Sequence, residues 1–243
     1  MKMGENTSEI FSGRTKTETS TKLYAETADF ISNIIRNKVG SQKENLKILD
    51  VGTHKGELIS DISNNLAPDY QLEVTGVDLN EDALAENKAV SDKIISDATN
   101  LQLKDNLFDI SIIRYVLQWN NFEKQKEIIK EILRVTNGLI LIEHAGPNDE
   151  DVISWRNNMS NLLSNNHVPK IMRENYFFSS KNEIESFLMK NNINFERLRD
   201  RRIEKVSNAF IERYNLSEEE SLLVRKILDD KDYIYQTDWI IYK

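Results

Sequence analysis

The chain has 243 residues, contains no cysteine and carries a formal net charge of −8. The lack of cysteine excludes disulfides, thiolate catalysis and cysteine-bound zinc. The acidic balance disfavours nonspecific binding to nucleic acid, because an acidic surface repels phosphate backbones. No apolar run approaches the roughly 20 residues of a membrane helix, and the polar N-terminus lacks a signal-peptide pattern. We therefore expect a cytoplasmic protein with no membrane partner.

Residues 1–20 are polar and without a period, which predicts a mobile arm. A leader helix is predicted over about 22–38. Short apolar runs then alternate with amphipathic stretches, which is typical of an α/β fold with a doubly wound, mostly parallel, seven-stranded sheet and helices on both faces. The first five predicted strands cover 46–51, 72–78, 93–97, 108–113 and 138–143. We expect a single domain over 21–243 with its core at 46–145.

The alternation changes after the fifth predicted strand. The segments at about 146–192 and 203–231 are predicted to be helical elaborations that form a lid over a small acceptor. Two capping-box patterns within them indicate helices that begin near Lys181 and near Glu218. The final apolar run, at about 233–242, predicts a C-terminal strand.

Asp50 lies near the end of the first predicted strand, and the chain then continues through Gly52 and Gly56 into a helix, which is the layout of a nucleotide-type loop. A dinucleotide G-x-G-x-x-G pattern would need glycine at His54 and Glu57, so a nicotinamide or flavin cofactor is disfavoured. A different pattern, acidic-x-Gly-x-Gly-x-Gly, matches at the acid and at two of its three glycines and departs only at His54. This pattern is the first motif of class I S-adenosylmethionine-dependent methyltransferases.

Further segments follow in the order of that family. The second strand ends in an acid at Asp78, about 22 residues beyond the last glycine. The stretch from Ser96 to Ile110 is similar to the family's "D-A…L-P-F…F-D-V" passage. Residues 114–119 are similar to its "L-H-W" segment, and residues 131–143 are similar to the helix and strand that usually read "E-x-x-R-V-L-K-P-G-G". The sequence thus resembles a class I methyltransferase of the small-molecule type over about 46–144.

The resemblance implies S-adenosylmethionine as the cofactor. The cofactor-binding residues that it implies are Asp50, Gly52, Thr53, Gly56, Asp78, Leu79, Asp97, Ala98 and Arg114. In this reading Asp78 takes both ribose hydroxyls and Asp97 accepts from the adenine amine. The simpler structural alternatives are a carboxylate at a helix N-terminus for Asp78 and a turn former for Asp97.

His144 and Gln118 are the candidate catalytic residues. His144 directly follows the fifth predicted strand, at its carboxyl end, where a near-neutral imidazole can deprotonate a hydroxyl or an amine. The alternative is a hydrogen-bonded structural histidine. Gln118 falls in the segment that lines the methyl-transfer pocket in the family. The neighbouring Trp119 fits a pocket position or a core position equally well. The three histidines lie in different segments, so no metal site is predicted.

A basic cluster stands out in the last third of the acidic chain, at Arg197, Arg199, Arg201 and Arg202. Alternate residues of a strand point to the same face, so the cluster places pairs of arginines together. We interpret it as a solvated edge strand protected by charge, in preference to a site for an anionic substrate.

These observations predict transfer of a methyl group from S-adenosylmethionine to an oxygen or nitrogen atom of a small-molecule acceptor by in-line displacement. Two alternatives stay open. One is a peptide, protein or tRNA methyltransferase, which needs an extended groove. The other is a non-catalytic cofactor-binding or partner-binding module, for which His54 is the only sequence hint. The acceptor and the oligomeric state are left open by the sequence.

Overall fold

The structure of the chain is a computed structural model. It describes residues 18–40, 43–147, 149–154, 157, 179–204, 208, 211, 217–228 and 233–243. Most of the predicted N-terminal arm and a large part of the first predicted elaboration lie outside the described residues.

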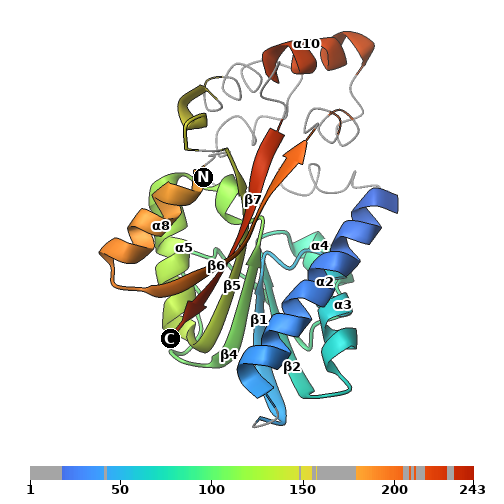
Figure 1. The fold of residues 1–243 in the computed structure, drawn as a ribbon. Helices are drawn as coiled ribbons and strands as arrows, with labels where there is room; N and C mark the ends of the chain where they lie inside the picture. The colour runs from blue at the N-terminus through green and yellow to red at the C-terminus, as the bar shows by residue number, and fades with distance from the viewer. Residues whose placement is uncertain are drawn as a thin grey trace.

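A seven-stranded sheet with the order β3-β2-β1-β4-β5-β7-β6 forms the centre of the fold (Figure 1). Its strands are β1 (Asn45–Val51), β2 (Gln71–Asp78), β3 (Asp92–Ile95), β4 (Phe108–Arg114), β5 (Thr136–Gly146), β6 (Asn194–Glu204) and β7 (Tyr233–Tyr242). The first five strands run parallel, whereas β7 is antiparallel to both β5 and β6. This confirms the predicted doubly wound, mostly parallel sheet. The carboxyl ends of β1 to β5 therefore lie at one edge.

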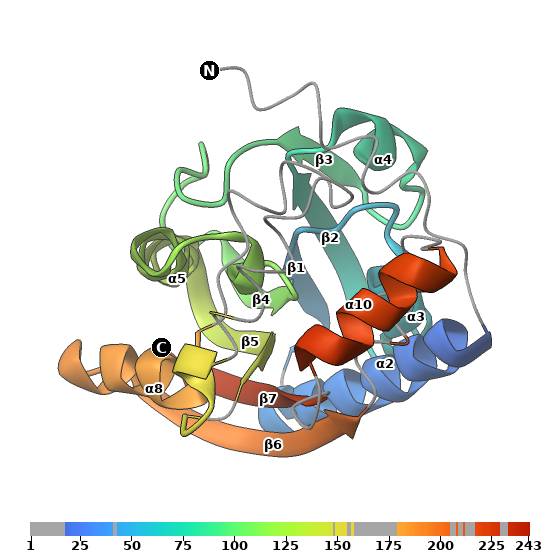
Figure 2. The ribbon, with the colours of Figure 1, turned by 90° about the horizontal axis from the view of Figure 1, so that it is seen from above.

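Helices cover both faces of the sheet. The described helices are α2 (Glu18–Val39), α3 (Glu57–Leu66), α4 (Glu81–Glu86), the 3-10 turn η3 (Leu117–Trp119), α5 (Phe122–Val135), α8 (Lys181–Lys190) and α10 (Glu218–Leu228). α2 and α3 lie against one face, and α5 and α8 lie against the other (Figures 1 and 2). The predicted helix starts near Lys181 and Glu218 are confirmed, and Ser180 forms a full capping box with Glu183.

Two apolar layers bind the helices to the sheet. Ile35 of α2 and Ile59 of α3 pack on Ile48 of β1, and all three are buried. On the other face, Ile129 of α5 and Leu188 of α8 belong to a second buried cluster. The apolar residues of α5 recur at helical spacing, so one stripe of the helix faces the sheet while its charged residues face outward.

Parts of both predicted elaborations are described. α8 belongs to the first and lies beside α5, whereas α10 belongs to the second and lies above the carboxyl ends of the central strands (Figure 2). Among the helices that the structure describes, none combines the length and the hydropathy needed to cross a bilayer.

Candidate active site

The turn between β1 and α3 carries the glycine motif. Gly52, His54 and Gly56 all adopt left-handed backbone conformations, with φ of 75°, 50° and 80°. The amides of Gly52 and Thr53 donate to the Val77 carbonyl at 2.8 and 3.1 Å, so the turn is held against the end of β2. His54 thus occupies the motif's middle glycine position with a glycine-like backbone, and its departure from the pattern leaves the turn intact.

Asp78 ties this turn to the end of β2. Its Oδ2 accepts the His54 amide at 2.7 Å, and its Oδ1 accepts the Asn80 amide at 2.8 Å. The bond to His54 stabilises the left-handed residue directly. A carboxylate oxygen has two lone pairs, so each oxygen of Asp78 can accept one more hydrogen bond. The pair of oxygens suits two neighbouring hydroxyl groups.

Asn87 supports the same turn, and sequence reasoning missed it. It is fully buried, and its Nδ2 donates to Thr53 Oγ1 at 3.0 Å and to the His54 carbonyl at 3.3 Å. A Cβ added to Gly56 would lie 2.2 Å from Asn87 Oδ1, so only glycine fits there. No sequence pattern marks this asparagine, because it reaches the turn only through the fold of the segment after α4.

Asp50 lies at the end of β1 beneath the turn and is buried. Burial raises the pKa of Asp50 to about 6; a hydrogen bond with Thr53 opposes the rise, and the charge of Asp78 adds to it. Two carboxylates therefore share this corner of the site. Such a corner favours a ligand that carries positive charge.

The ends of β2 and β3 meet next to Asp78. Ser96 donates its amide to the Asp78 carbonyl at 3.3 Å. Asp97 Oδ1 accepts both the amide and the hydroxyl of Thr99, each at 2.9 Å, which fixes the predicted turn. Ala98 is half-buried in this turn. Leu79 is 44% exposed at the end of β2, and Ile95, which sequence reasoning missed, is 55% exposed at the end of β3. The two offer apolar surface to a ligand at this edge.

One arginine of α5 clamps the loop that follows Asp97. Arg134 Nη2 donates to the Leu101 carbonyl at 2.9 Å, and its Nη1 donates to the Leu103 carbonyl at 2.8 Å and to Asp105. Glu131 bonds Arg134 and also accepts the Leu101 amide at 2.8 Å. All five guanidinium N–H groups are thereby used. The E-x-x-R spacing was visible in the sequence, but its structural role was not.

Arg114 ends β4, beside the glycine turn, and its charge acts on Asp50. Its Nε donates to Glu143 Oε1 at 2.8 Å, and its guanidinium carbon lies 4.6 Å from the ring centroid of Tyr24 and 4.4 Å from that of Tyr115. The side chain is thus engaged within the protein.

The two candidate catalytic residues lie in the interior. Gln118 is buried in η3, and its Oε1 has no hydrogen-bond partner within the described part of the chain. His144 is buried on the α5 and α8 side of β5, where its Nε2 lies 3.0 Å from the Ser179 carbonyl. Burial lowers the pKa of His144 to about 4, so the ring is neutral at physiological pH. Their catalytic roles stay predictions.

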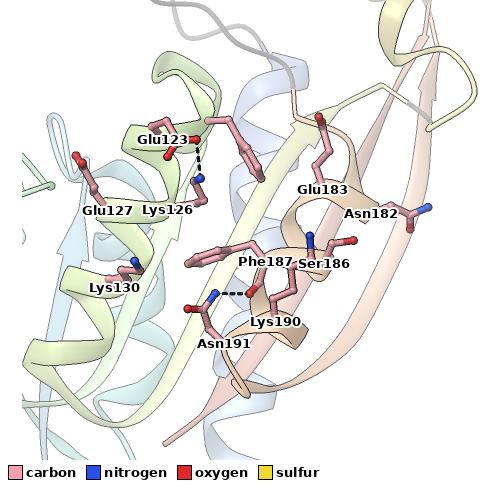
Figure 3. A pocket seen from close by; sticks show the side chains of 11 residues that line it. Glu123, Lys126, Glu127, Lys130, Asn182, Glu183, Ser186, Phe187, Lys190 and Asn191 are labelled. Atoms are coloured by element: carbon pink, nitrogen blue, oxygen red, sulfur yellow. Dashed lines mark hydrogen bonds and ion pairs between the residues drawn. The ribbon is translucent and has the colours of Figure 1, made fainter.

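A hollow lined by described residues lies elsewhere, between α5 and α8 (Figure 3). Its volume is about 630 Å³, and Phe122 and Phe187 line it together with lysine and glutamate side chains such as Lys126 and Glu123. It opens on the outer side of the two helices rather than at the strand ends. It is therefore distinct from the motif residues.

The predicted cofactor residues after β1, β2 and β3 come together at the carboxyl edge, with Arg114 beside them. The glycine turn presents exposed backbone at Gly52, Asp78 presents two oxygens with spare lone pairs, and Leu79 and Ile95 add apolar surface. This donor set fits a molecule with a positively charged amino-acid end, a ribose and a flat base. The strand order and this site together define a class I S-adenosylmethionine-dependent methyltransferase.

Comparison with known proteins gives the same class. The family model described as "Methyltransferase domain" matches residues 42–192, more than half of the chain, and the chain belongs to this family. The sequence matches none of the curated proteins with which it was compared.

Solved structures share the fold at low sequence identity. The YcgJ protein from Bacillus subtilis is 15% identical, with a TM-score of 0.67 over 90% of this chain and 98% of that one. The magnesium protoporphyrin IX methyltransferase from Synechocystis PCC 6803, solved with bound S-adenosylhomocysteine, is 12% identical, with a TM-score of 0.57 over 97% and 92% of the two chains. The plantazolicin methyltransferase BpumL, also in complex with S-adenosylhomocysteine, is 18% identical, with a TM-score of 0.56 over 97% and 89%.

Proposed function

We propose that this enzyme transfers a methyl group from S-adenosylmethionine to an oxygen or nitrogen atom of a small-molecule acceptor. The observation that carries the proposal is the glycine turn with Asp78 bonded to its third residue. The bound cofactor supplies an electrophilic methyl group on a sulfonium. Transfer to the acceptor atom would leave the sulfur as a neutral thioether, and an acceptor O–H or N–H group would give up its proton to a base. Such a transfer depends mainly on alignment and on exclusion of water.

Each cofactor residue has a defined task in this proposal. Asp78 accepts the two ribose hydroxyls, and Asp97 accepts the adenine amine beside Ala98. Leu79 packs against the nucleoside. The acidic corner at Asp50, with Thr53 and the backbone of Arg114, receives the amino-acid end. Gly52 and Gly56 let the turn approach the ligand closely.

His144 and Gln118 remain the proposed catalytic residues. His144 Nε2 faces the Ser179 carbonyl, which leaves Nδ1 as the nitrogen that can accept a proton. Its lowered pKa makes it a weak base, so it suits an acceptor that loses its proton easily.

A small acceptor is favoured over a nucleic acid by the net charge of −8. One structural neighbour is named for a tetrapyrrole acceptor, magnesium protoporphyrin IX. A peptide or protein acceptor is the alternative enzyme reading, and a non-catalytic module is the alternative of a different class. A protein named a [4+2]-cyclase shares the fold at a TM-score of 0.57, so the fold alone does not determine the reaction.

Calorimetric titration of the purified protein with S-adenosylmethionine, S-adenosylhomocysteine and NAD tests the cofactor assignment. We expect micromolar binding of the first two and none of NAD. Asp78→Ala removes a charged acceptor of several hydrogen bonds, so it should weaken binding about 100-fold or more. Asp82→Ala, which removes an exposed carboxylate from the first turn of α4, is the matched control and should bind as the wild type does.

Two results would count against this assignment: no binding of either sulfur compound, or equal affinities in the Asp78 and Asp82 variants. Tight binding without turnover of any acceptor would favour the non-catalytic module.

A further inference from the structure

The basic cluster of β6 does not stand free as a solvated edge. β6 is the edge strand of the sheet, as predicted, but Arg197 forms an ion pair with Glu185 of α8. Arg199 and Arg201 point to the opposite face, toward α2, in register with Asp238 and Gln236 of β7. Both are half-buried. The groups around Arg199 differ from those around Arg201, and this difference could not be predicted from the sequence.

Arg199 belongs to a balanced group of charges. Its Nε donates to Asp238 Oδ2 at 2.5 Å, and its Nη2 lies 3.7 Å from Glu143 Oε2. Glu143 in turn pairs with Arg114 at 2.8 Å. Two guanidinium groups thus face two buried carboxylates, which is the arrangement that buried charges require.

Arg201 is an additional cation beside this balanced group. Its Nε and Nη2 donate to Gln236 Oε1 at 3.0 and 2.6 Å, and that oxygen belongs to a neutral amide. Within the described residues, no carboxylate forms an ion pair with Arg201. The nearby Asp238 feels its charge but is bonded to Arg199. Three of its five N–H groups remain, including the end-on fork formed by Nη1 and Nη2.

Tyr115 connects Arg201 to the end of β4. Its hydroxyl donates at 3.0 Å to the same Gln236 Oε1, and its amide donates to the Glu143 carbonyl at 3.0 Å. Tyr115 has a φ of 54°, an uncommon conformation for a bulky residue. Burial and Glu143 raise the pKa of Tyr115, so the phenol stays protonated and acts as a donor. Gln236 Oε1 is thus saturated, and this fixes the orientation of the Arg201 guanidinium.

The position of Tyr115 places Arg201 close to the proposed cofactor site. Tyr115 directly follows Arg114, and the charge of Arg114 acts on Asp50 beneath the glycine turn. Arg201 is therefore linked through Gln236 and Tyr115 to the strand end beside the proposed cofactor site. β6 and β7 continue for two residues beyond the last pair of β5 with β7, and α10 lies above them (Figure 1). Arg201 thus lies near the end of β6, at the carboxyl edge of the sheet.

We propose that Arg201, oriented by Gln236 and Tyr115, binds a carboxylate group of the methyl acceptor. The inference rests on the proposed function, because it names the acceptor class of the same site. A planar carboxylate matches the two parallel N–H groups of a guanidinium fork. It also supplies the negative charge that carboxylates of the described residues give to Arg114 and Arg199 but not to Arg201.

Binding of matched acid and amide probes to the protein saturated with S-adenosylhomocysteine tests this inference. The probes are benzoate with benzamide, phenylacetate with phenylacetamide, and hexanoate with hexanamide. We expect at least one acid to bind roughly 10- to 100-fold more tightly than its amide, which is the effect of charge-assisted hydrogen bonds. Arg201→Gln should abolish that preference. Arg202→Gln removes the same charge from the adjacent, outward-facing residue and should retain it.

Each outcome decides the question. The inference is overturned if no acid binds, if acids and amides bind alike, or if Arg201→Gln keeps the preference. Arg201→Lys keeps the charge without the fork and should retain only part of the preference for the acid over its amide. This variant also provides a test if Arg201→Gln fails to fold. Titration of each protein with S-adenosylhomocysteine alone reports separately on the cofactor site. Normal cofactor affinity with no acid preference would reject only the acceptor inference.

Discussion

The carboxyl edge of the sheet has two halves that are built by different means. On the cofactor side, the loops after β1, β2 and β3 hold one another mainly through backbone groups, as in the bonds from the His54 and Asn80 amides to Asp78. On the proposed acceptor side, where β4, β5 and β6 end and β7 begins, side chains distant in sequence meet. Tyr115 and Gln236 are 121 residues apart. The cofactor side is thus encoded in local spacing, and the acceptor side depends on strand order.

The largest effect is expected when the backbone of the cofactor side is disturbed. Gly56→Ala places a methyl group 2.2 Å from Asn87 Oδ1 at a residue with φ of +80°. Gly40→Ala introduces the same strain at φ of +65° with no atom within 4 Å. We expect the free energy of unfolding to fall by about 3 kcal/mol for Gly56→Ala and by about 1 kcal/mol for Gly40→Ala. Urea denaturation measures both values.

The two glycine variants should also differ in ligand binding. Gly56→Ala should weaken S-adenosylhomocysteine, because the turn must shift, whereas Gly40→Ala should not. Equal losses of stability, together with unchanged affinity in both variants, would show that Asn87 does not hold the turn as described.

The difference between the two sides explains which features of the site could be predicted from the sequence and which could not. The glycine turn, the acid at Asp78 and the start of α8 were predictable because each depends on residues close together in the chain. Asn87 was missed because a single asparagine has no periodic or spacing signal. The edge position of β6 was predicted, yet the partners of its arginines come from α8, β5 and β7, so the burial of Arg199 and Arg201 could not be foreseen.

The pH dependence of stability should have opposite signs on the two sides. Burial raises the pKa of Asp50 to about 6 from an ordinary 3.8, so its contribution is complete below pH 3.8 and is lost as the pH rises through 6. Burial lowers the pKa of His144 from 6.5 to about 4, so its contribution is present above pH 6.5 and is lost as the pH falls through 4. The two slopes oppose each other in the wild type.

Single substitutions separate the two slopes. Between about pH 4.5 and about pH 7.5, the free energy of unfolding of Asp50→Asn should rise by about 2 kcal/mol relative to the wild type. Over the same range, that of His144→Gln should fall by about 2 kcal/mol relative to the wild type. Urea denaturation at several pH values measures the differences. Parallel curves for a variant and the wild type would show that the residue titrates as it does in the unfolded chain.

The smallest predicted effect concerns the clamp on the loop after Asp97. Arg134→Gln removes the bonds to the Leu101 and Leu103 carbonyls, which frees the loop that follows the proposed adenine site. Arg36 offers a matched control, because it is similarly exposed and bonds Asp69, Asn33 and the Asn65 carbonyl at the far end of α2. Both glutamine variants should lose about 1 to 2 kcal/mol of stability.

Only the Arg134 variant should lose affinity for S-adenosylhomocysteine, by about tenfold, because only that arginine positions a loop of the cofactor side. Calorimetric titration of the two variants at the same temperature measures the difference. If both weaken the ligand equally, the effect is one of general stability and the clamp has no separate role. If neither does, the adenine end is held without the loop, and the cofactor side depends on the glycine turn and Asp78 alone.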